Sequence, residues 1–340
     1  VSDGISVRKD GDFYLIDNGT YQFRLRDYKG DRLKGKTLAE VPHWCGGMRA
    51  KTQKNWDGKA YFESNAPVVG AKTELVASGP VFADFKITYE FEGAPDGEVE
   101  AMPLASGKQS HLFAPNQLPR ERIPKRPFHY ELLIRFVMED AWIDVNERFH
   151  FPRDEKASPF GITHYYIEWG QGGLPVDTVS WVRWFEYDKF GGNTTQQYVP
   201  AKPRPAQKGR PFALLRPRWN QGGGGAQDFV LTSGGAAPGR KTEAGAGYRP
   251  ENPAVGVVAA YASKWVGPYV NYIPVYAYDG NRGRARFPMV DGERSGMHYG
   301  QRAYGLLVGP RSAMENLNSV VRRHTDWTLT AQINKYVLQW

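Results

Sequence analysis

Apolar and polar residues alternate along much of the chain, which is the pattern of a β-strand with one buried face. In 80–92 every second residue is apolar, and the residues between them are polar from Asp84 onward. The apolar positions are Val81, Ala83, Phe85, Ile87, Tyr89 and Phe91. The segment 12–26 alternates on both sides of Asp17-Asn18-Gly19, where Gly19 can adopt the positive φ of a bulged hairpin turn. We therefore predict antiparallel strands joined by hairpins.

The same pattern predicts strands through most of the remaining sequence. Two long strands, 130–137 and 142–151, are expected to pair across a turn at Glu139-Asp140. Shorter strands are predicted at 212–215, 229–232, 255–261, 272–278, 285–289 and 304–308. Convincing helical spacing is found only near the C-terminus, where Ser312-Ala313-Met314-Glu315 forms a capping box. The predicted fold is all-β, a large antiparallel sandwich over 1–310 with a short C-terminal helical segment over 311–340.

Two long irregular connections interrupt this pattern. The first, 94–127, is rich in proline and glycine and carries a basic run formed by Arg120, Arg122, Lys125 and Arg126. Long irregular connections are usually functional or mobile, so this run is either a basic loop beside a binding face or ordinary solvated surface. The second, 191–253, includes glycines at 222–225 but lacks the strand and helix context of a phosphate-binding loop.

The composition indicates a large core and an anionic partner. Apolar residues make up 41% of the chain and aromatic residues 14%, enough to fill a core, and this excludes a disordered chain. The formal net charge is +8, which attracts acidic polysaccharides, nucleic acids and anionic membranes alike. The sequence has no recognised nucleic-acid-binding module and no run of the roughly 20 apolar residues that a membrane span needs. The predicted partner is therefore an acidic polysaccharide or oligosaccharide, with no nucleic acid and no membrane.

Cysteine and histidine spacing gives little indication of a metal or a redox role. The single cysteine, Cys45, has no partner for an intramolecular disulfide and is interpreted as a small buried apolar residue. No histidine cluster has zinc spacing and no acidic loop has the calcium pattern, so no metal site is predicted. Any cofactor stays unknown at this point.

Five segments share the order and character of the strands in a known type of sandwich. They are Asp17-Asn18-Gly19-Thr20-Tyr21, Ser78-Gly79-Pro80-Val81-Phe82-Ala83, 130–136, 142–149 and 302–309. Together they resemble galactose-mutarotase-like β-supersandwich domains, over most of the chain from Ile5 to Pro310. Such domains occur in rhamnogalacturonan exolyase-like proteins and other polysaccharide lyases, and at the N-terminus of several glycoside hydrolases and phosphorylases. In several of these enzymes a helical barrel follows, so the resemblance implies that 311–340 could be a connector to a missing domain.

Two segments concentrate titratable and aromatic residues. If 161–169 is extended, His164, Tyr166 and Glu168 share one face of the strand. The chain then reaches Trp181, Arg183 and Trp184, which could form a platform for stacking a sugar ring. The second segment, 296–302, has glycines that let the backbone pass close to a ligand. It supplies His298, Tyr299 and Arg302.

These residues fit the eliminative cleavage of a uronic-acid polymer. Such a reaction needs a base for the proton at C5, an acid for the leaving oxygen and a cation to neutralise the carboxylate. The catalytic candidates are His164, Tyr166, His298, Tyr299 and Arg302, which we predict to share one concave face. The substrate-binding candidates are Trp181, Arg183, Trp184 and Glu168. Hydrolysis would instead need two carboxylates about 5–10 Å apart, with candidates at Glu168, Glu186 and Asp188.

Each of these residue types also has a plainer interpretation. The histidines could be ordinary hydrogen-bonded residues, and the tryptophans could be core rings. Glu147 and Arg148 on a long strand are interpreted as cross-strand ion partners. The leading hypothesis is a secreted or periplasmic polysaccharide lyase that cleaves an acidic glycan by β-elimination. The alternatives are a noncatalytic glycan-binding or scaffolding module of a larger enzyme, and a glycoside hydrolase.

Overall fold

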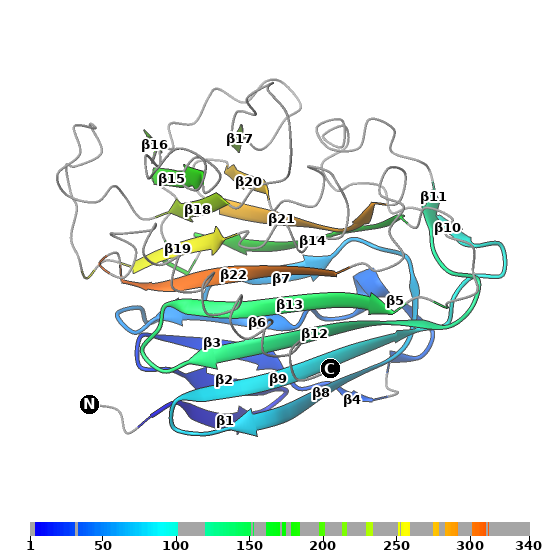
Figure 1. Ribbon diagram of the computed structural model, residues 1–340, viewed down its shortest axis with the longest axis horizontal. Helices are drawn as coiled ribbons and strands as arrows, with labels where there is room; N and C mark the ends of the chain where they lie inside the picture. The colour runs from blue at the N-terminus through cyan, green and yellow to red at the C-terminus, as the bar shows by residue number, and fades with distance from the viewer. Residues whose placement is uncertain are drawn as a thin grey trace, which may run out of the picture.

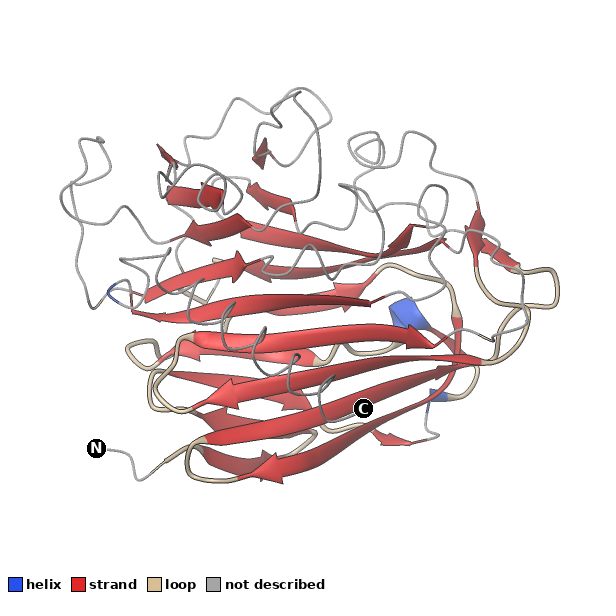
Figure 2. Ribbon diagram, viewed as in Figure 1, coloured by secondary structure: helices blue, strands red, loops and turns tan. Residues whose placement is uncertain are grey.

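The structure is a computed structural model (Figure 1). The residue ranges that it describes cover most of the N-terminal half of the chain and separate strands in the C-terminal half. The described residues are 4–30, 33–100, 120–150, 152, 161–170, 172–174, 178–183, 197–200, 213–215, 229–233, 251, 253–258, 275–278, 283–291, 301–310 and 312. Within these ranges nearly all regular structure is β-strand, as Figure 2 shows. A 3-10 helix spans Leu38–Glu40, and the described ranges contain no α-helix. The predicted C-terminal helix falls at 311–340, almost entirely outside these ranges.

The strands form three sheets, and every strand pair that the structure describes is antiparallel. The four-stranded sheet has the order β1 (Ser6–Asp10), β2 (Phe13–Asp17), β3 (Tyr21–Arg26) and β6 (Cys45–Ala50). The seven-stranded sheet has the order β10 (Glu98–Glu100), β11 (Arg120–Arg122), β14 (Gly161–Trp169), β21 (Gly283–Asp291), β20 (Val275–Tyr278) and β17 (Ala213–Leu215), and β7 (Lys59–Phe62) also pairs with β14.

The eleven-stranded sheet is the largest. Its order is β16 (Gln197–Pro200), β15 (Thr178–Arg183), β18 (Phe229–Ser233), β19 (Pro253–Val258), β22 (Gln301–Pro310), β13 (Trp142–His150), β12 (Phe128–Val137), β9 (Phe82–Phe91), β8 (Pro67–Ser78) and β4 (Lys29–Gly30), with β5 (Lys36–Thr37) also on β8. In Figure 1 the four-stranded sheet lies behind β8, β9, β12 and β13. The all-β sandwich that the alternation predicts is therefore confirmed.

The core lies between the four-stranded sheet and one face of the eleven-stranded sheet. Tyr14 and Phe23 of the smaller sheet meet Phe85 and Phe136 of the larger one, with ring centroids 5.1 Å apart for Tyr14–Phe85 and 5.3 Å for Phe23–Phe136. Burying a side chain of this kind contributes about 1.5–3 kcal/mol, so the shared aromatic layer holds the two sheets together. The predicted buried face of β9 is confirmed from Ala83 to Phe91, whereas Val81 precedes the strand and is 55% exposed.

One buried asparagine joins two hairpin turns. Asn18, in the β2–β3 turn, is fully buried, and its Nδ2 donates to the carbonyls of Val137 and Asp140 at 2.9 and 2.6 Å. Its Oδ1 accepts from the backbone amides of Thr20 and Tyr21, both at 3.0 Å. The side chain thus satisfies polar backbone groups of its own turn and of the β12–β13 turn, which fixes the two hairpins against each other.

The basic run of the first irregular connection lies partly in a strand. Residues 94–127 include β10 and β11, and the register of this pair places Arg122 opposite Glu98 and Arg120 opposite Glu100. Opposite charges at directly opposed positions favour each other, so two of the four residues of the basic run belong to a mixed-charge ribbon. The prediction of an irregular loop is wrong for β10 and β11. Each of these strands has only three residues, which is too short for an alternating pattern to distinguish a strand from a loop.

Candidate functional site

The candidate site lies where β7, β14 and β21 run side by side in the seven-stranded sheet. Phe62 of β7 and both Ile167 and Trp169 of β14 are buried in the core. Because side chains alternate along a strand, Tyr61 and Glu168 belong to the opposite face of this sheet. The predicted extended conformation of 161–169 is confirmed by β14.

The register of the three strands collects basic and aromatic positions around Glu168. Glu168 is directly opposite Lys59 on β7 and Arg284 on β21. One step along, Tyr166 is opposite Tyr61 and Arg286. His164 follows at the next step, opposite Pro288. We call the set formed by Lys59, Tyr61, His164, Tyr166, Glu168, Arg284 and Arg286 the polar strip.

Within the polar strip, Glu168 and Tyr61 are joined directly. The Tyr61 hydroxyl donates to Oε1 of Glu168 at 2.9 Å, although 107 residues separate them in the chain. Glu168 is 9% exposed, and Tyr61 is half-buried. Hydrogen bonds to buried carboxyl groups hold both partners in one geometry, so the pair is a fixed element of the strip.

A buried aspartate explains why β7 and β14 meet at this point. Asp57 lies just before β7, and its Oδ2 accepts from the backbone amides of Gly170 and Leu174 at 2.8 and 3.0 Å. Its Oδ1 accepts from the Gly58 amide at 2.9 Å. These bonds tie the end of β14 to the start of β7, so the backbone that carries Tyr61 and the backbone that carries Glu168 are held in register.

The predicted site residues fall into three groups. His164, Tyr166 and Glu168 lie together on β14 in the seven-stranded sheet. Trp181 and Arg183 lie on β15 of the eleven-stranded sheet, and Arg302 lies on β22 of the same sheet. Since β18 and β19 lie between β15 and β22, those two strands are about 14 Å apart.

The remaining predicted residues lie outside the described ranges. They are Trp184, Glu186, Asp188, His298 and Tyr299. The single concave site that would join His164 to His298 therefore stays a prediction. Tyr61, Arg284 and Arg286 were not predicted, because alternation reveals the face of a residue within its strand but not which strand lies alongside.

A second tyrosine–glutamate pair lies in the eleven-stranded sheet. The Tyr304 hydroxyl on β22 donates to Oε1 of Glu147 on β13 at 2.9 Å, and each residue is 2% exposed. Arg302 is directly opposite Glu147 in the register of these two strands. Glu147 is thus a cross-strand hydrogen-bond partner of Tyr304, two residues along β22 from Arg302, and its predicted cross-strand ion pair stays a prediction.

Comparisons with known proteins give similarity at the level of solved structures. No protein-family model matches the chain, and neither does any curated protein sequence. An α-mannosidase from Enterococcus faecalis V583 is 9% identical with a TM-score of 0.43, over 90% of this chain and 30% of that one. A GH36 α-galactosidase from Geobacillus stearothermophilus is 7% identical with a TM-score of 0.31, over 90% of this chain and 40% of that one.

A smaller protein is matched over nearly its whole length. A galactose mutarotase related enzyme from Lactobacillus acidophilus is 9% identical with a TM-score of 0.37, over 87% of this chain and 97% of that one. The chain spans about a third of the length of the α-mannosidase that it matches. Scores this low do not assign the chain to a family. Among the described ranges, no helix has the length and apolar character needed to cross a membrane.

Proposed function

We propose that the protein is carbohydrate-active, that it binds an acidic glycan along the polar strip, and that it cleaves this glycan by β-elimination. The observation that supports this proposal is the Tyr61–Glu168 pair, bounded on both sides by basic positions. Lys59 and Arg284 are opposite Glu168, and Arg286 is opposite Tyr166. The strip therefore has three basic positions and one carboxyl group, a balance that suits an anionic ligand.

The chemistry of elimination can be assigned to residue types in the strip. Arginine pairs with a carboxylate through two parallel hydrogen bonds, so Arg284 and Arg286 would neutralise a uronate and stabilise the enolate. His164 would accept the C5 proton, and Tyr166 would donate a proton to the leaving oxygen. Glu168 accepts a hydrogen bond from the Tyr61 hydroxyl, which would fix the orientation of the Tyr61 ring beside the sugar.

Hydrolysis is the second candidate, because the described ranges contain other buried carboxyl groups in the same region as Glu168. Glu63 is 6% exposed and is the first residue after β7, and Glu168 is 9% exposed on β14. Since Lys59 is opposite Glu168, Glu63 lies four residues further along. This is about 13 Å of backbone, at or beyond the longest separation that inverting hydrolysis uses. The spacing therefore argues against Glu63 and Glu168 as the two carboxylates of a hydrolase.

A product assay separates the two chemistries. Elimination leaves a C4–C5 double bond that absorbs in the near ultraviolet, whereas hydrolysis releases reducing ends without this absorbance. We expect pectic, alginate-like or glycosaminoglycan polymers to yield the absorbing product, and Tyr166→Phe and His164→Ala to abolish it while leaving binding in place. Reducing ends without new absorbance would replace the lyase with a hydrolase. Binding with neither signal would favour the noncatalytic glycan-binding module.

A binding assay tests the anionic ligand independently of the chemistry. In affinity electrophoresis we expect acidic polymers, but not neutral ones, to retard the protein, and added salt to weaken this, since screening limits such charges to about 10 Å at 0.1 M. Arg284→Gln with Arg286→Gln should remove most of the retardation. Arg8→Gln is the matched control, because Arg8 is an exposed arginine on β1 of another sheet. Equal retardation by neutral polymers would overturn the acidic-glycan proposal.

A polymeric substrate also has a consequence for location. Polysaccharides do not cross membranes unaided, so we propose that the protein acts in the secreted or periplasmic compartment. Fractionation of the source cells checks this, and recovery of the protein only in the cytoplasmic fraction would contradict it.

A further inference from the structure

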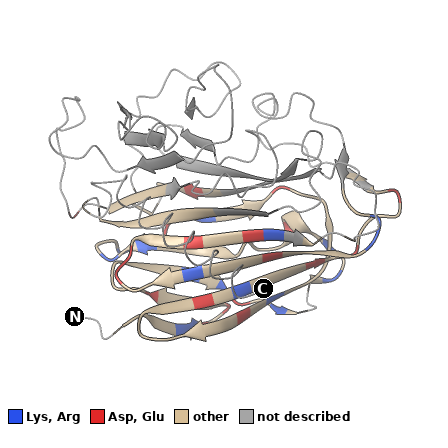
Figure 3. Ribbon diagram, in the orientation of Figure 1, with Lys and Arg blue, Asp and Glu red and all other residues tan. Residues whose placement is uncertain are grey.

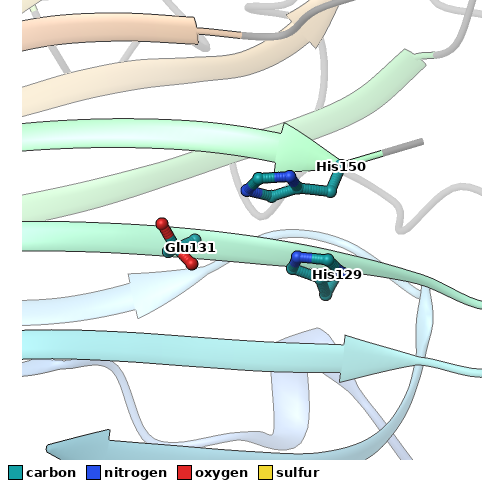
Figure 4. Close-up of side chains that lie close together, drawn as sticks. All are labelled: His129, Glu131 and His150. Carbon is teal, nitrogen blue, oxygen red and sulfur yellow. The ribbon is translucent and has the colours of Figure 1, made fainter. Parts of the chain in front are cut away.

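Three potential metal ligands meet on the outward face of the eleven-stranded sheet, away from the polar strip. His129 on β12 is directly opposite His150 on β13, and Glu131 follows His129 on the same face. One ligand atom from each of the three residues lies within 4.8 Å of the others. Figure 4 shows the two imidazole rings beside each other, with the Glu131 carboxyl group on the neighbouring position of β12.

The geometry of this cluster is close to that of a three-ligand metal site. The imidazole rings are stacked with centroids 4.1 Å apart and an angle of 14° between planes. Zinc binds histidine nitrogen and carboxylate oxygen at about 2.0–2.2 Å, which places neighbouring ligand atoms about 3.3 Å apart. Small rotations of the three side chains are enough to close the difference, since all three are only half-buried. Two histidines and a glutamate are also a ligand set of known zinc sites that keep an open position.

The residue types select the class of metal. Imidazole nitrogen favours zinc, copper, nickel and cobalt, whereas calcium and magnesium prefer oxygen ligands alone. Glu90, opposite His129, adds a negative charge, whereas Lys86 and Arg148 beside Glu131 oppose a cation.

We propose that His129, Glu131 and His150 bind a divalent transition-metal ion of the zinc class on this face. Lys86 is the competitor, because its Nζ lies 2.6 Å from Oε2 of Glu131 and must give way when the metal enters. Figure 3 shows that charges of both signs lie along β9, β12 and β13 here, so the cluster is not part of a uniformly basic surface. The site is independent of the function proposed above.

The metal would close the open end of the β12–β13 hairpin. His129 and His150 form the pair furthest from the Glu139-Asp140 turn in the described register. A ligand that binds only the folded state stabilises it by mass action, by about 2.7 kcal/mol at one hundred times its dissociation constant. A metal at this place would therefore stabilise the two central strands of the large sheet.

Cobalt serves as the probe, because Co²⁺ adopts zinc-like sites and gives visible absorption when bound. We expect the untagged full chain, stripped with a chelator, to bind one Co²⁺ per molecule with tetrahedral-type absorption, and Zn²⁺ to displace it. His150→Gln and Glu131→Gln should each weaken binding by at least about tenfold, as even loss of an outer-shell partner costs 10–100-fold. Asp10→Asn is the matched control, since Asp10 is also an exposed carboxylate paired with a basic residue, Arg24, at 3.5 Å, but lies on β1 of another sheet.

A gain of affinity completes the test. Lys86→Met removes the competing ammonium group and should tighten Co²⁺ binding, whereas a variant that merely misfolds would lose it. Near-ultraviolet circular dichroism of each variant without metal checks that the fold is intact. No saturable Co²⁺ binding by the wild-type chain, or equal affinity in His150→Gln and wild type, would overturn the proposal.

Discussion

The two tyrosine–glutamate pairs have the same hydrogen bond in different surroundings. The hydrogen bonds of Tyr61–Glu168 and Tyr304–Glu147 are both 2.9 Å long, and each joins two neighbouring strands of one sheet. Tyr304 and Glu147 are 2% exposed among apolar core residues, whereas Tyr61 is half-buried and Glu168 has basic positions on both sides. The same chemical pair therefore lies inside the core in one sheet and beside basic register positions in the other.

This contrast teaches that a buried carboxyl group is not by itself a sign of function. Glu147 is opposite Leu132 on β12, so one side of it faces an apolar strand. Glu168 is opposite Lys59 and Arg284. Glu147 has one basic register position, Arg302, whereas Glu168 has one on each side, and this difference distinguishes the candidate site from the core pair.

The largest expected effect comes from the residue that aligns the first pair. Asp57→Ala removes the acceptor for the Gly170, Leu174 and Gly58 amides. A buried group left without its hydrogen bond costs about 1–3 kcal/mol, so loss of these bonds should lower the free energy of unfolding by about 3 kcal/mol or more. Urea denaturation measures this. Amide exchange should show the loss on β7 and β14, and uniform loss across β13 and β22 would contradict the local role of Asp57.

The hydroxyl groups of the two tyrosines provide the next test. Tyr304→Phe should lower the free energy of unfolding by about 1–3 kcal/mol, because a buried carboxyl group loses a donor. Tyr61→Phe should cost about 1 kcal/mol or less, because Tyr61 is half-buried, but should reduce glycan cleavage. Thermal denaturation and the absorbance assay measure the two effects. Equal destabilisation with unchanged cleavage would remove the functional difference between the pairs.

The last effect is a dependence of stability on acid that arises at His43, close to the first pair. The His43 ring packs against the ring of Phe62, which follows Tyr61 on β7, and the ring centroids are 4.4 Å apart. Burial lowers the pKa of His43 well below its usual range. The unfolded chain therefore takes up a proton near pH 6.5 that the folded chain does not. His43 leaves stability unchanged above this pH, and below it stability should fall by at most about 1.4 kcal/mol per pH unit.

Comparison with a variant isolates the His43 contribution. His43→Gln should flatten the acid slope of the free energy of unfolding, measured by urea titration from pH 7.5 to 5. Amide protection on β7 should be lost before protection on β22 as the pH falls. An unchanged slope in His43→Gln would show that other groups cause the acid dependence.

The local sequence determined the strands and part of their register. Alternation in 80–92 and 130–137 predicted β9 and β12, because one buried face imposes a period of two on consecutive residues. A hairpin register also follows from its turn. Counting outward from Glu139-Asp140 places His129 opposite His150, so this part of the proposed metal site was readable from the sequence although it was not predicted.

Only the tertiary structure decided which strands became neighbours in the candidate site. Tyr61 and Glu168 are 107 residues apart, and Glu147 and Tyr304 are 157 apart, so no turn links them. Alternation gives each residue a face, but it does not say that β14 lies between β7 and β21. That choice depends on how buried side chains such as Phe62, Ile167 and Trp169 pack together, and on the buried Asp57 that ties two distant segments.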